Sequence, residues 1–199
     1  MKEEVLVEQL KAGSKEAFDE LYTKYKNLAI HTAYLITGNL SDSEDVTQET
    51  FVKVWLHARE LQNNNGFKAW MMQILVRTAY RIGKKSKKEI PDDEAVRRME
   101  RPDEVSSLDK VIQQEEAERI LAAVRNLSAR LRTVVILYYY DSFTVKEIAG
   151  ILKITEGTVK SRLHTARKRM QSALEDNLEK ALQEESHTCT SCISGHKFP

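Results

Sequence analysis

Residues 144–169 constrain the fold of this chain most strongly, because they predict two short helices joined by a tight turn. Thr144 is a natural N-cap, and Glu147, three residues later, completes a capping box. Apolar side chains follow at helical spacing up to Leu152, where the first helix is expected to end. Thr155 then offers a second N-cap. Two helices in this order predict a helix-turn-helix, which can place its second helix in the major groove of DNA.

The second of these helices has a composition suited to DNA. Val159 and Leu163 supply the buried stripe at positions i and i+4. The other positions are polar and mostly cationic: Lys160, Ser161, Arg162, His164, Arg167, Lys168 and Arg169. This helix is therefore the candidate DNA-recognition helix.

The near-neutral net charge of +1 conceals a strong segregation of charge along the chain. Residues 53–88 hold nine Lys and Arg against one acid, and residues 119–174 hold eleven against three. Between them, residues 89–118 hold four against eleven. Since a uniformly solvated surface intersperses its charges, two basic blocks indicate two places where a polyanion is held.

A low content of helix-breaking residues, 7 Gly and 3 Pro in 199, predicts an all-α protein. Acids and prolines mark residues 89–109 as a linker between two small helical domains, 1–88 and 110–182, with a tail at 183–199. The expected N-terminal helices are 4–12, 15–37, 43–60 and 67–84.

One segment, TVVILYYY at residues 133–140, has the β-branched and aromatic content of a buried strand. It continues the helical spacing of Leu127, Leu131 and Val134, and a lone strand would have no partner. We therefore predict a helix, with its three tyrosines in the core and in helix packing rather than on a stacking platform.

The N-terminal basic block, residues 53–88, combines a cationic face with an aromatic residue. Its members are Arg77, Tyr80, Arg81, Lys84, Lys85, Lys87 and Lys88. Cations and an aromatic ring grip single-stranded nucleic acid through phosphate contacts and base stacking. Tyr80 and Trp70 are equally compatible with burial, which is favoured for Trp70. The polar turn LQNNNG at 61–66 precedes this helix, and no packing requirement explains it.

Residues 42–55, DSEDVTQETFVKVW, form a helix whose first-turn acids favour the helix dipole. From spacing alone, its charged face with Asp45, Gln48, Glu49 and Lys53 is ordinary solvated surface.

The order of these segments resembles the extracytoplasmic-function (ECF) sigma factors of bacterial RNA polymerase. The resemblance runs from about residue 8 to 175 and is carried by AFDELYTKY, GNLSDSEDVTQETFVKVW, GFKAWMMQILVRTAY, the acidic linker and LSARLRTVVILYYYDSFTVKEIAGILKITEGTVKSRLHTAR. It implies a protein that directs promoter-specific initiation, in a stress or envelope response, with core RNA polymerase and promoter DNA as partners and an anti-sigma factor as a possible one.

The resemblance also implies three contact surfaces. The surface that docks on the clamp helices of the polymerase comprises Asp45, Gln48, Glu49, Phe51 and Lys53. The surface that captures flipped bases of the minus-ten element comprises Leu61, Asn63, Asn64, Asn65, Trp70, Arg77, Tyr80, Arg81, Lys84 and Lys85. The minus-thirty-five surface has Lys160, Ser161, His164 and Thr165 on bases, Arg162, Arg167 and Lys168 on phosphates, and Thr158 beside them. The acidic linker is expected to follow the RNA channel of the polymerase.

Three residues depart from the family pattern. Arg77 replaces a frequent Asn, and Thr165 replaces a frequent Arg. Lys153 replaces a frequent Gly in the turn, where a left-handed backbone costs a residue with a Cβ about 1 kcal/mol.

The tail carries four possible soft or borderline metal ligands: His187, Cys189, Cys192 and His196. A cluster this short lacks the helix or hairpin that orients zinc ligands, so a disordered tail is favoured over a metal or redox sensor, and no cofactor is expected. No disulfide framework is available to the rest of the chain.

Other function classes fit less well. The chain has no phosphate-binding Gly loop and no HExxH, which argues against an enzyme and against a small-molecule substrate. It has neither a signal peptide nor an apolar run that could insert into a membrane, so a cytoplasmic location is expected. The remaining alternative is a stand-alone helix-turn-helix regulator, which would dimerise and bind duplex DNA unaided.

Overall fold

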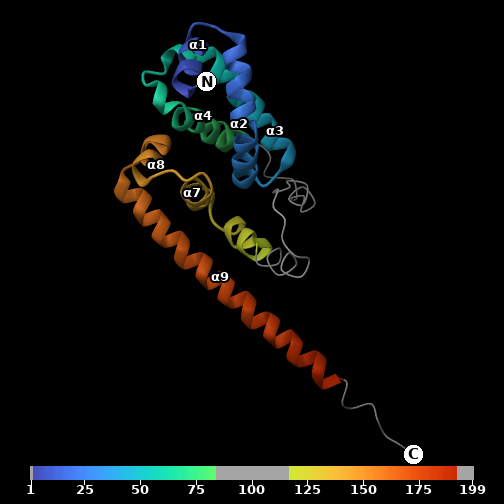
Figure 1. Cartoon of the computed structure of the whole chain (residues 1–199). Helices are drawn as coiled ribbons and strands as arrows, with labels where there is room; N and C mark the ends of the chain where they lie inside the picture. Colours follow the sequence, from blue (N-terminus) through green and yellow to red (C-terminus); the bar gives the residue numbers. More distant parts are fainter. Residues whose placement is uncertain (1, 84–116, 192–199) are drawn as a thin grey trace, which may run out of the picture.

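A computed structural model describes the backbone of residues 2–83 and 117–191, and the side chains of 2–83 and 117–175. Every regular element in these ranges is helical, which confirms the all-α fold (Figure 1). The N-terminal elements are α1 (Glu3–Lys11), α2 (Lys15–Thr37), α3 (Leu40–His57), the 3₁₀ turns η1 (Ala58–Glu60) and η2 (Asn64–Gly66), and α4 (Phe67–Gly83). The predicted linker 89–109 lies outside the described residues.

Local signals set the corner between α2 and α3. Ser14 caps α2 by accepting a hydrogen bond from the Ala17 backbone N–H at 3.2 Å. α2 ends at Gly38, whose φ of 78° is the left-handed conformation that glycine adopts without strain. Asn39 follows at once and caps α3 by accepting from the Asp42 N–H at 3.1 Å. The two long helices therefore meet in a short, fixed turn.

Apolar faces of α1 to α4 form one core. Its fully buried members include Val7, Leu21, Val46, Phe67 and Leu75. Each of these side chains contributes about 1.5–3 kcal/mol by its removal from water, so the four helices form a stable support for the surface residues they carry.

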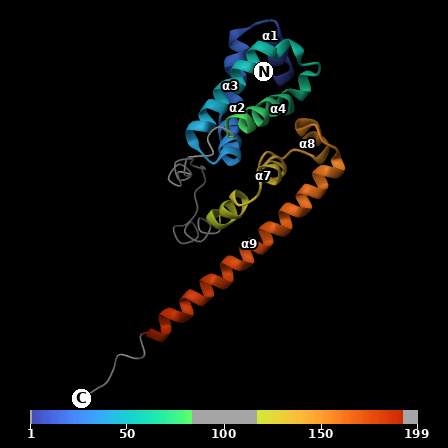
Figure 2. The same ribbon diagram turned by 180° about the vertical axis from the view of Figure 1, so that it is seen from behind.

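The C-terminal elements are a helical segment at 117–125, α7 (Ala129–Val135), the π-helical turn η3 (Ile136–Tyr140), α8 (Val145–Leu152) and α9 (Glu156–Ser191). Seen from both sides, α9 extends well past the other helices (Figure 2). It continues beyond residue 182, the predicted end of the second domain. The rest of the predicted tail, from residue 192, lies outside the described residues.

Residues 133–140 are helical, as predicted, but the expected burial of the tyrosines is wrong for two of the three. Tyr139 is 55% exposed and Tyr140 is 38% exposed, whereas Tyr138 is half-buried. The π-helical turn rotates the end of this helix, so the rings leave the core. Both exposed rings still connect helices, because the Tyr140 hydroxyl lies 2.8 Å from His31 Nδ1 and Tyr139 contacts Arg167.

The helix-turn-helix has the geometry that its sequence predicts. Thr144 and Glu147 form the complete capping box: the Glu147 N–H donates to the Thr144 hydroxyl at 3.3 Å, and the Thr144 N–H donates to the Glu147 carboxylate at 2.8 Å. Thr155 accepts from the Thr158 N–H at 3.1 Å at the start of α9. Between the helices Lys153 has φ 52° and ψ 51°, so a lysine holds the left-handed position of the turn.

Replacing Lys153 by glycine is expected to stabilise the protein by up to about 1 kcal/mol, because glycine adopts this conformation without the Cβ clash. The measurement is the midpoint of urea unfolding. Gly150, which lies inside α8 at a negative φ, provides the control, since Gly150→Ala tests helix propensity alone. A lower midpoint for Lys153→Gly would show that the lysine side chain stabilises the turn.

The two predicted domains pack against each other. α8 lies against α4, as both views show, and η3 and α7 contact α2. The apolar cluster is continuous across this boundary: Val134, Leu137 and Ile148 join the core of α1 to α4. A second, smaller cluster of Val124, Leu127, Leu131, Val135 and Ala166 lies within the C-terminal helices. Among the described residues, no helix is long and apolar enough to cross a membrane.

Candidate nucleic-acid and polymerase interfaces

The outer face of α3 carries a stripe of exposed side chains, which are polar in the first half of the helix and apolar in the second half. Asp45 and Gln48 are exposed, as predicted. The same face continues with Val52, Trp55 and Leu56, whose side chains are 56%, 41% and 67% exposed. Helical spacing from Asp45 is the sequence signal that places these apolar residues on the same face of the helix. A stripe of exposed apolar side chains is typical of a protein-binding surface.

Phe51 does not belong to that surface. It is 3% exposed, and its ring packs edge-on against Tyr22 with the centroids 4.8 Å apart. The predicted contact of Phe51 with the polymerase is therefore wrong, because the helix turns this side chain into the core between α2 and α3. Phe51 therefore stabilises the packing of α3 against α2.

Glu49 links the predicted polymerase surface to the predicted DNA surface. Its carboxylate accepts from Lys53 Nζ at 2.7 Å and also pairs with Arg81 on α4. The hydrogen bond from Lys53, together with Arg81, holds the pKa of Glu49 below its usual value. Lys53 in turn donates to the Thr78 hydroxyl at 3.2 Å. These residues therefore hold α3 and α4 together, and α4 keeps a fixed position relative to the α3 stripe.

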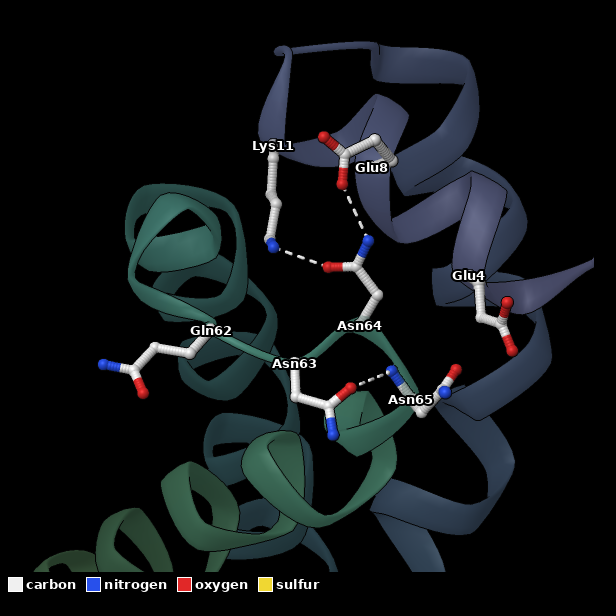
Figure 3. Close-up of a pocket in the computed structure, with 7 residues that line it drawn as sticks. All are labelled: Glu4, Glu8, Lys11, Gln62, Asn63, Asn64 and Asn65. Atoms are coloured by element: carbon white, nitrogen blue, oxygen red, sulfur yellow. Dashed lines mark hydrogen bonds between the residues drawn. The ribbon is translucent and has the colours of Figure 1, made fainter.

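The η2 loop bears an open, polar pocket of about 400 Å³ (Figure 3). It is lined by Glu4, Glu8, Lys11, Gln62, Asn63, Asn64 and Asn65. Asn63 and Asn65 are exposed and Asn64 is half-buried, in agreement with a surface role. Leu61 is the exception, because it is buried in the core and cannot contact DNA. The predicted contact of Leu61 is therefore wrong: it anchors the loop.

α4 presents only part of its predicted cationic face. Arg77 and Arg81 are exposed, and Trp70 is half-buried against the core. Tyr80 is half-buried beside the C-terminal domain, where its hydroxyl lies 2.9 Å from the Thr133 hydroxyl. Burial raises the pKa of the Tyr80 hydroxyl. In this arrangement the predicted stacking residue is only partly accessible to a base. Lys84 and Lys85 lie outside the described residues.

The first turns of α9 expose three of the four predicted base-contacting side chains: Lys160, Ser161 and His164. Lys168, which is predicted to contact a phosphate, is exposed as well. Thr165 is half-buried, and its hydroxyl donates to the Ser161 carbonyl at 2.9 Å. That hydroxyl is committed to its own helix and is less available to a base than predicted.

The other predicted residues of α9 have partners within the protein. Arg167 donates to the Tyr139 hydroxyl at 2.6 Å and lies over its ring at 5.6 Å from the centroid. Thr158 lies in the first turn of α9, where its hydroxyl is 2.8 Å from that of the N-cap residue Thr155. Arg162 is half-buried beside Tyr80. The contacts of Arg167 and Arg162 were not evident from spacing, because they join residues far apart in the chain.

Polar groups are buried where the two domains meet. Asp141 is 2% exposed and accepts from the hydroxyl of Thr32, which is also buried, at 2.9 Å. Lys68 Nζ donates to the Asp141 carbonyl at 2.8 Å. Burial raises the pKa of the Asp141 carboxyl to about 6, opposed by the Thr32 hydrogen bond and the Lys68 charge. At the exposed edge of the same boundary, Gln73 Nε2 donates to the Gly150 carbonyl at 3.0 Å.

An arginine supports the same boundary. Arg132 Nη1 donates to the Ile36 carbonyl near the end of α2 at 3.2 Å. Its Nη2 donates to the Arg125 and Leu127 carbonyls at 2.6 and 3.1 Å. Desolvation by burial lowers the pKa of this guanidinium. Because its partners are carbonyls, Arg132 stabilises the domain contact through directed hydrogen bonds rather than an ion pair.

The described side chains include no candidate metal site. Nowhere among them do three or more His, Cys, Asp or Glu residues lie close enough together to hold an ion. The tail candidates His187, Cys189, Cys192 and His196 lie outside the described side chains.

Known proteins share both halves of this architecture. The models of Sigma-70 region 2 and Sigma-70 region 4 match residues 21–89 and 117–170. The ECF RNA polymerase sigma factor SigW of Bacillus subtilis is 30% identical over 178 residues, covering 85% of this chain and 95% of that protein. The chain belongs to the ECF sigma factors. The ECF sigma-E factor of Escherichia coli K12 is 27% identical over 175 residues, covering 83% of this sigma factor and 90% of that protein.

Solved structures of sigma factors share the fold. CnrH, solved in complex with the cytosolic domain of CnrY, has a TM-score of 0.67 at 20% identity and covers 87% of this chain and 97% of that one. RpoE of Bartonella quintana, solved with the anti-sigma factor NepR, has a TM-score of 0.61 at 26% identity and covers 79% and 96%. This ECF sigma factor directs promoter-specific initiation with core RNA polymerase, and the stand-alone regulator is not favoured. The family is a non-enzymatic class of initiation factor.

Proposed function

We propose that three surfaces of this sigma factor divide the work of initiation. The α3 stripe, with Asp45, Gln48 and the exposed apolar residues beyond them, docks on the polymerase. The η2 loop and the exposed part of α4 engage the minus-ten element, and the first turns of α9 engage the minus-thirty-five element. The observation that carries this assignment is the exposure of Lys160, Ser161 and His164 on a capped recognition helix.

The packed arrangement of the two domains cannot serve both promoter elements at once. About 25 base pairs separate the minus-ten and minus-thirty-five elements, which is roughly 85 Å at about 3.4 Å per step. In the structure α4 and α8 touch, with Gln73 Nε2 at 3.0 Å from the Gly150 carbonyl. We infer that this arrangement is a closed form, and that the domains 1–88 and 110–182 separate on the linker 89–109 when the polymerase binds.

A partner that favours the closed form is an anti-sigma factor. The sigma factors CnrH and RpoE are similar to this chain in fold, and RpoE was solved with its anti-sigma factor. A protein that bound α4 and α9 together would cover both DNA-contacting surfaces, whose net positive charge suits an acidic partner.

Run-off transcription tests the assignment. The purified chain with bacterial core polymerase is expected to give a promoter-dependent transcript from a template library, and the chain alone is expected to bind duplex DNA weakly. Tight binding to duplex DNA by the chain alone, together with no transcript from any template in the presence of core enzyme, would contradict the proposal.

Substitutions on the recognition helix are expected to separate base contacts from phosphate contacts. Lys160→Ala or His164→Ala should cost about 1–3 kcal/mol and change the order of preferred promoters. Lys168→Ala should weaken binding by a similar factor on every promoter. Lys168 is a better phosphate control than Arg167, because Arg167 also anchors Tyr139. Equal losses on all promoters for every variant would refute the division of roles.

A further inference from the structure

α1 lies against the loop that we assign to the minus-ten element, and its polar face is directed at one asparagine. Lys11 Nζ donates to Asn64 Oδ1 at 2.5 Å, and Asn64 Nδ2 donates to Glu8 Oε2 at 2.7 Å (Figure 3). An ammonium group only donates and a carboxylate only accepts. The two charges therefore allow a single orientation of the Asn64 amide and hold the loop at its centre.

The support for this contact is rigid. On its other face α1 buries Leu6, Val7 and Leu10 in the core. At its C-terminal end the Lys11 carbonyl accepts from Arg59 Nε at 3.3 Å. Packing and hydrogen bonding at both faces leave α1 little freedom, as accurate positioning of a binding loop requires.

Some polar groups of the loop stabilise its backbone, and others are exposed to solvent. Asn63 caps η2, since its Oδ1 accepts from the Asn65 N–H at 3.1 Å. The Gln62 and Asn65 side chains are exposed at the rim of the pocket. Asn64 keeps one N–H and one lone pair beyond those that α1 occupies, and both have fixed directions. A base edge entering the pocket meets a preset pattern of donors and acceptors.

We infer that Glu8 and Lys11 are positioning residues that set base preference at the minus-ten element, an inference that rests on the proposed function of the loop. They act through Asn64 and need not touch DNA themselves. Base discrimination by this sigma factor depends on α1, a helix that precedes residues 21–89, the segment matched by the region 2 model.

The test measures binding of holoenzyme to fork-junction DNA that carries each of the four bases at each single-stranded minus-ten position. Wild type is expected to prefer one base at the captured position. Glu8→Ala and Lys11→Ala are expected to reduce that preference about tenfold, the size of one good base contact, with unchanged affinity for core polymerase. Glu4→Ala is the matched control, because Glu4 lines the same pocket with the same charge but makes no contact with Asn64.

Two further variants separate positioning from general stability. Glu8→Gln keeps an acceptor for Asn64 and is expected to retain the preference. The double exchange Glu8→Lys with Lys11→Glu restores both hydrogen bonds to a reversed amide, so it is expected to regain a preference that both single alanine variants lack. An equal loss for all four bases, an effect matched by Glu4→Ala, or a double exchange without preference would overturn the inference. A wild-type holoenzyme with no preference at any position would instead contradict the proposed function of the loop.

Discussion

A covalent link between α4 and α8 is expected to abolish promoter-dependent transcription by this sigma factor. Gln73→Cys and Gly150→Cys place one thiol on each side of the 3.0 Å contact between the domains. A Cβ at Gly150 meets nothing within 4 Å, so the helix accommodates the new side chain. Cys189→Ser and Cys192→Ser remove the native thiols. A bismaleimide with a reducible spacer then holds the closed form, in which the two DNA-contacting surfaces cannot reach both promoter elements.

Reduction of the spacer is expected to restore transcription in the same sample, which excludes damage by the modification. Each single cysteine variant, treated with the reagent in the same way, is expected to transcribe normally. Run-off transcription with core polymerase is the measurement. A cross-linked chain that transcribes as well as the reduced one would show that the closed form is compatible with initiation.

Acidification is expected to favour the closed form through Asp141. Its carboxyl has a pKa of about 6 when the domains are packed, against an ordinary value of 3.8, so the closed form binds the proton more tightly. Closing is therefore weakened as the pH rises from about 3.8 to about 6, by about 3 kcal/mol in total once the carboxylate is ionised in both forms. The Thr32 hydroxyl contacts the Asp141 carboxylate, and the Lys68 ammonium contacts the Asp141 carbonyl. The third neighbour is His31, which contacts the hydroxyl of the preceding residue, Tyr140.

Small-angle scattering of the free protein between pH 4 and pH 8 measures this change as a radius of gyration. Wild type is expected to expand as the pH rises, and Asp141→Asn, which resembles the protonated acid, is expected to remain compact at pH 8. His31→Gln is the control for the second titratable group and is expected to keep most of the pH dependence. A compact wild type at every pH, or an Asp141→Asn chain that expands like wild type, would contradict this role of Asp141.

Local sequence signals predicted the elements well, because caps and helical spacing act within a few residues. The capping box of Thr144 and Glu147 is present, and α2 has the predicted bounds of residues 15–37. The family pattern, with a frequent Gly at the position of Lys153, predicted a left-handed backbone there, which the structure confirms. Each of these features depends on neighbours in the chain, so a single sequence contains the information.

The errors concern side chains whose environment is set by distant helices. Phe51 lies in a family motif and Leu61 in the loop that the resemblance assigns to the minus-ten element, but both pack into the core. Tyr80, a candidate for base stacking, is half-buried beside α7 of the other domain, and Tyr139 is exposed at the π-helical end of its helix. Membership of a motif identifies the surface in general, but it does not distinguish the residues that form the surface from those that support it.

The sequence by itself determined the all-α fold, the helix-turn-helix and the two basic segments, because periodicity, caps and charge are properties of short stretches of chain. Only the tertiary structure decided that α1 fixes Asn64, that Asp141 is buried against Thr32, and that the two domains are closed on each other. These contacts join residues that are 53 to 109 positions apart. Their free energies depend on burial and geometry that no local pattern specifies.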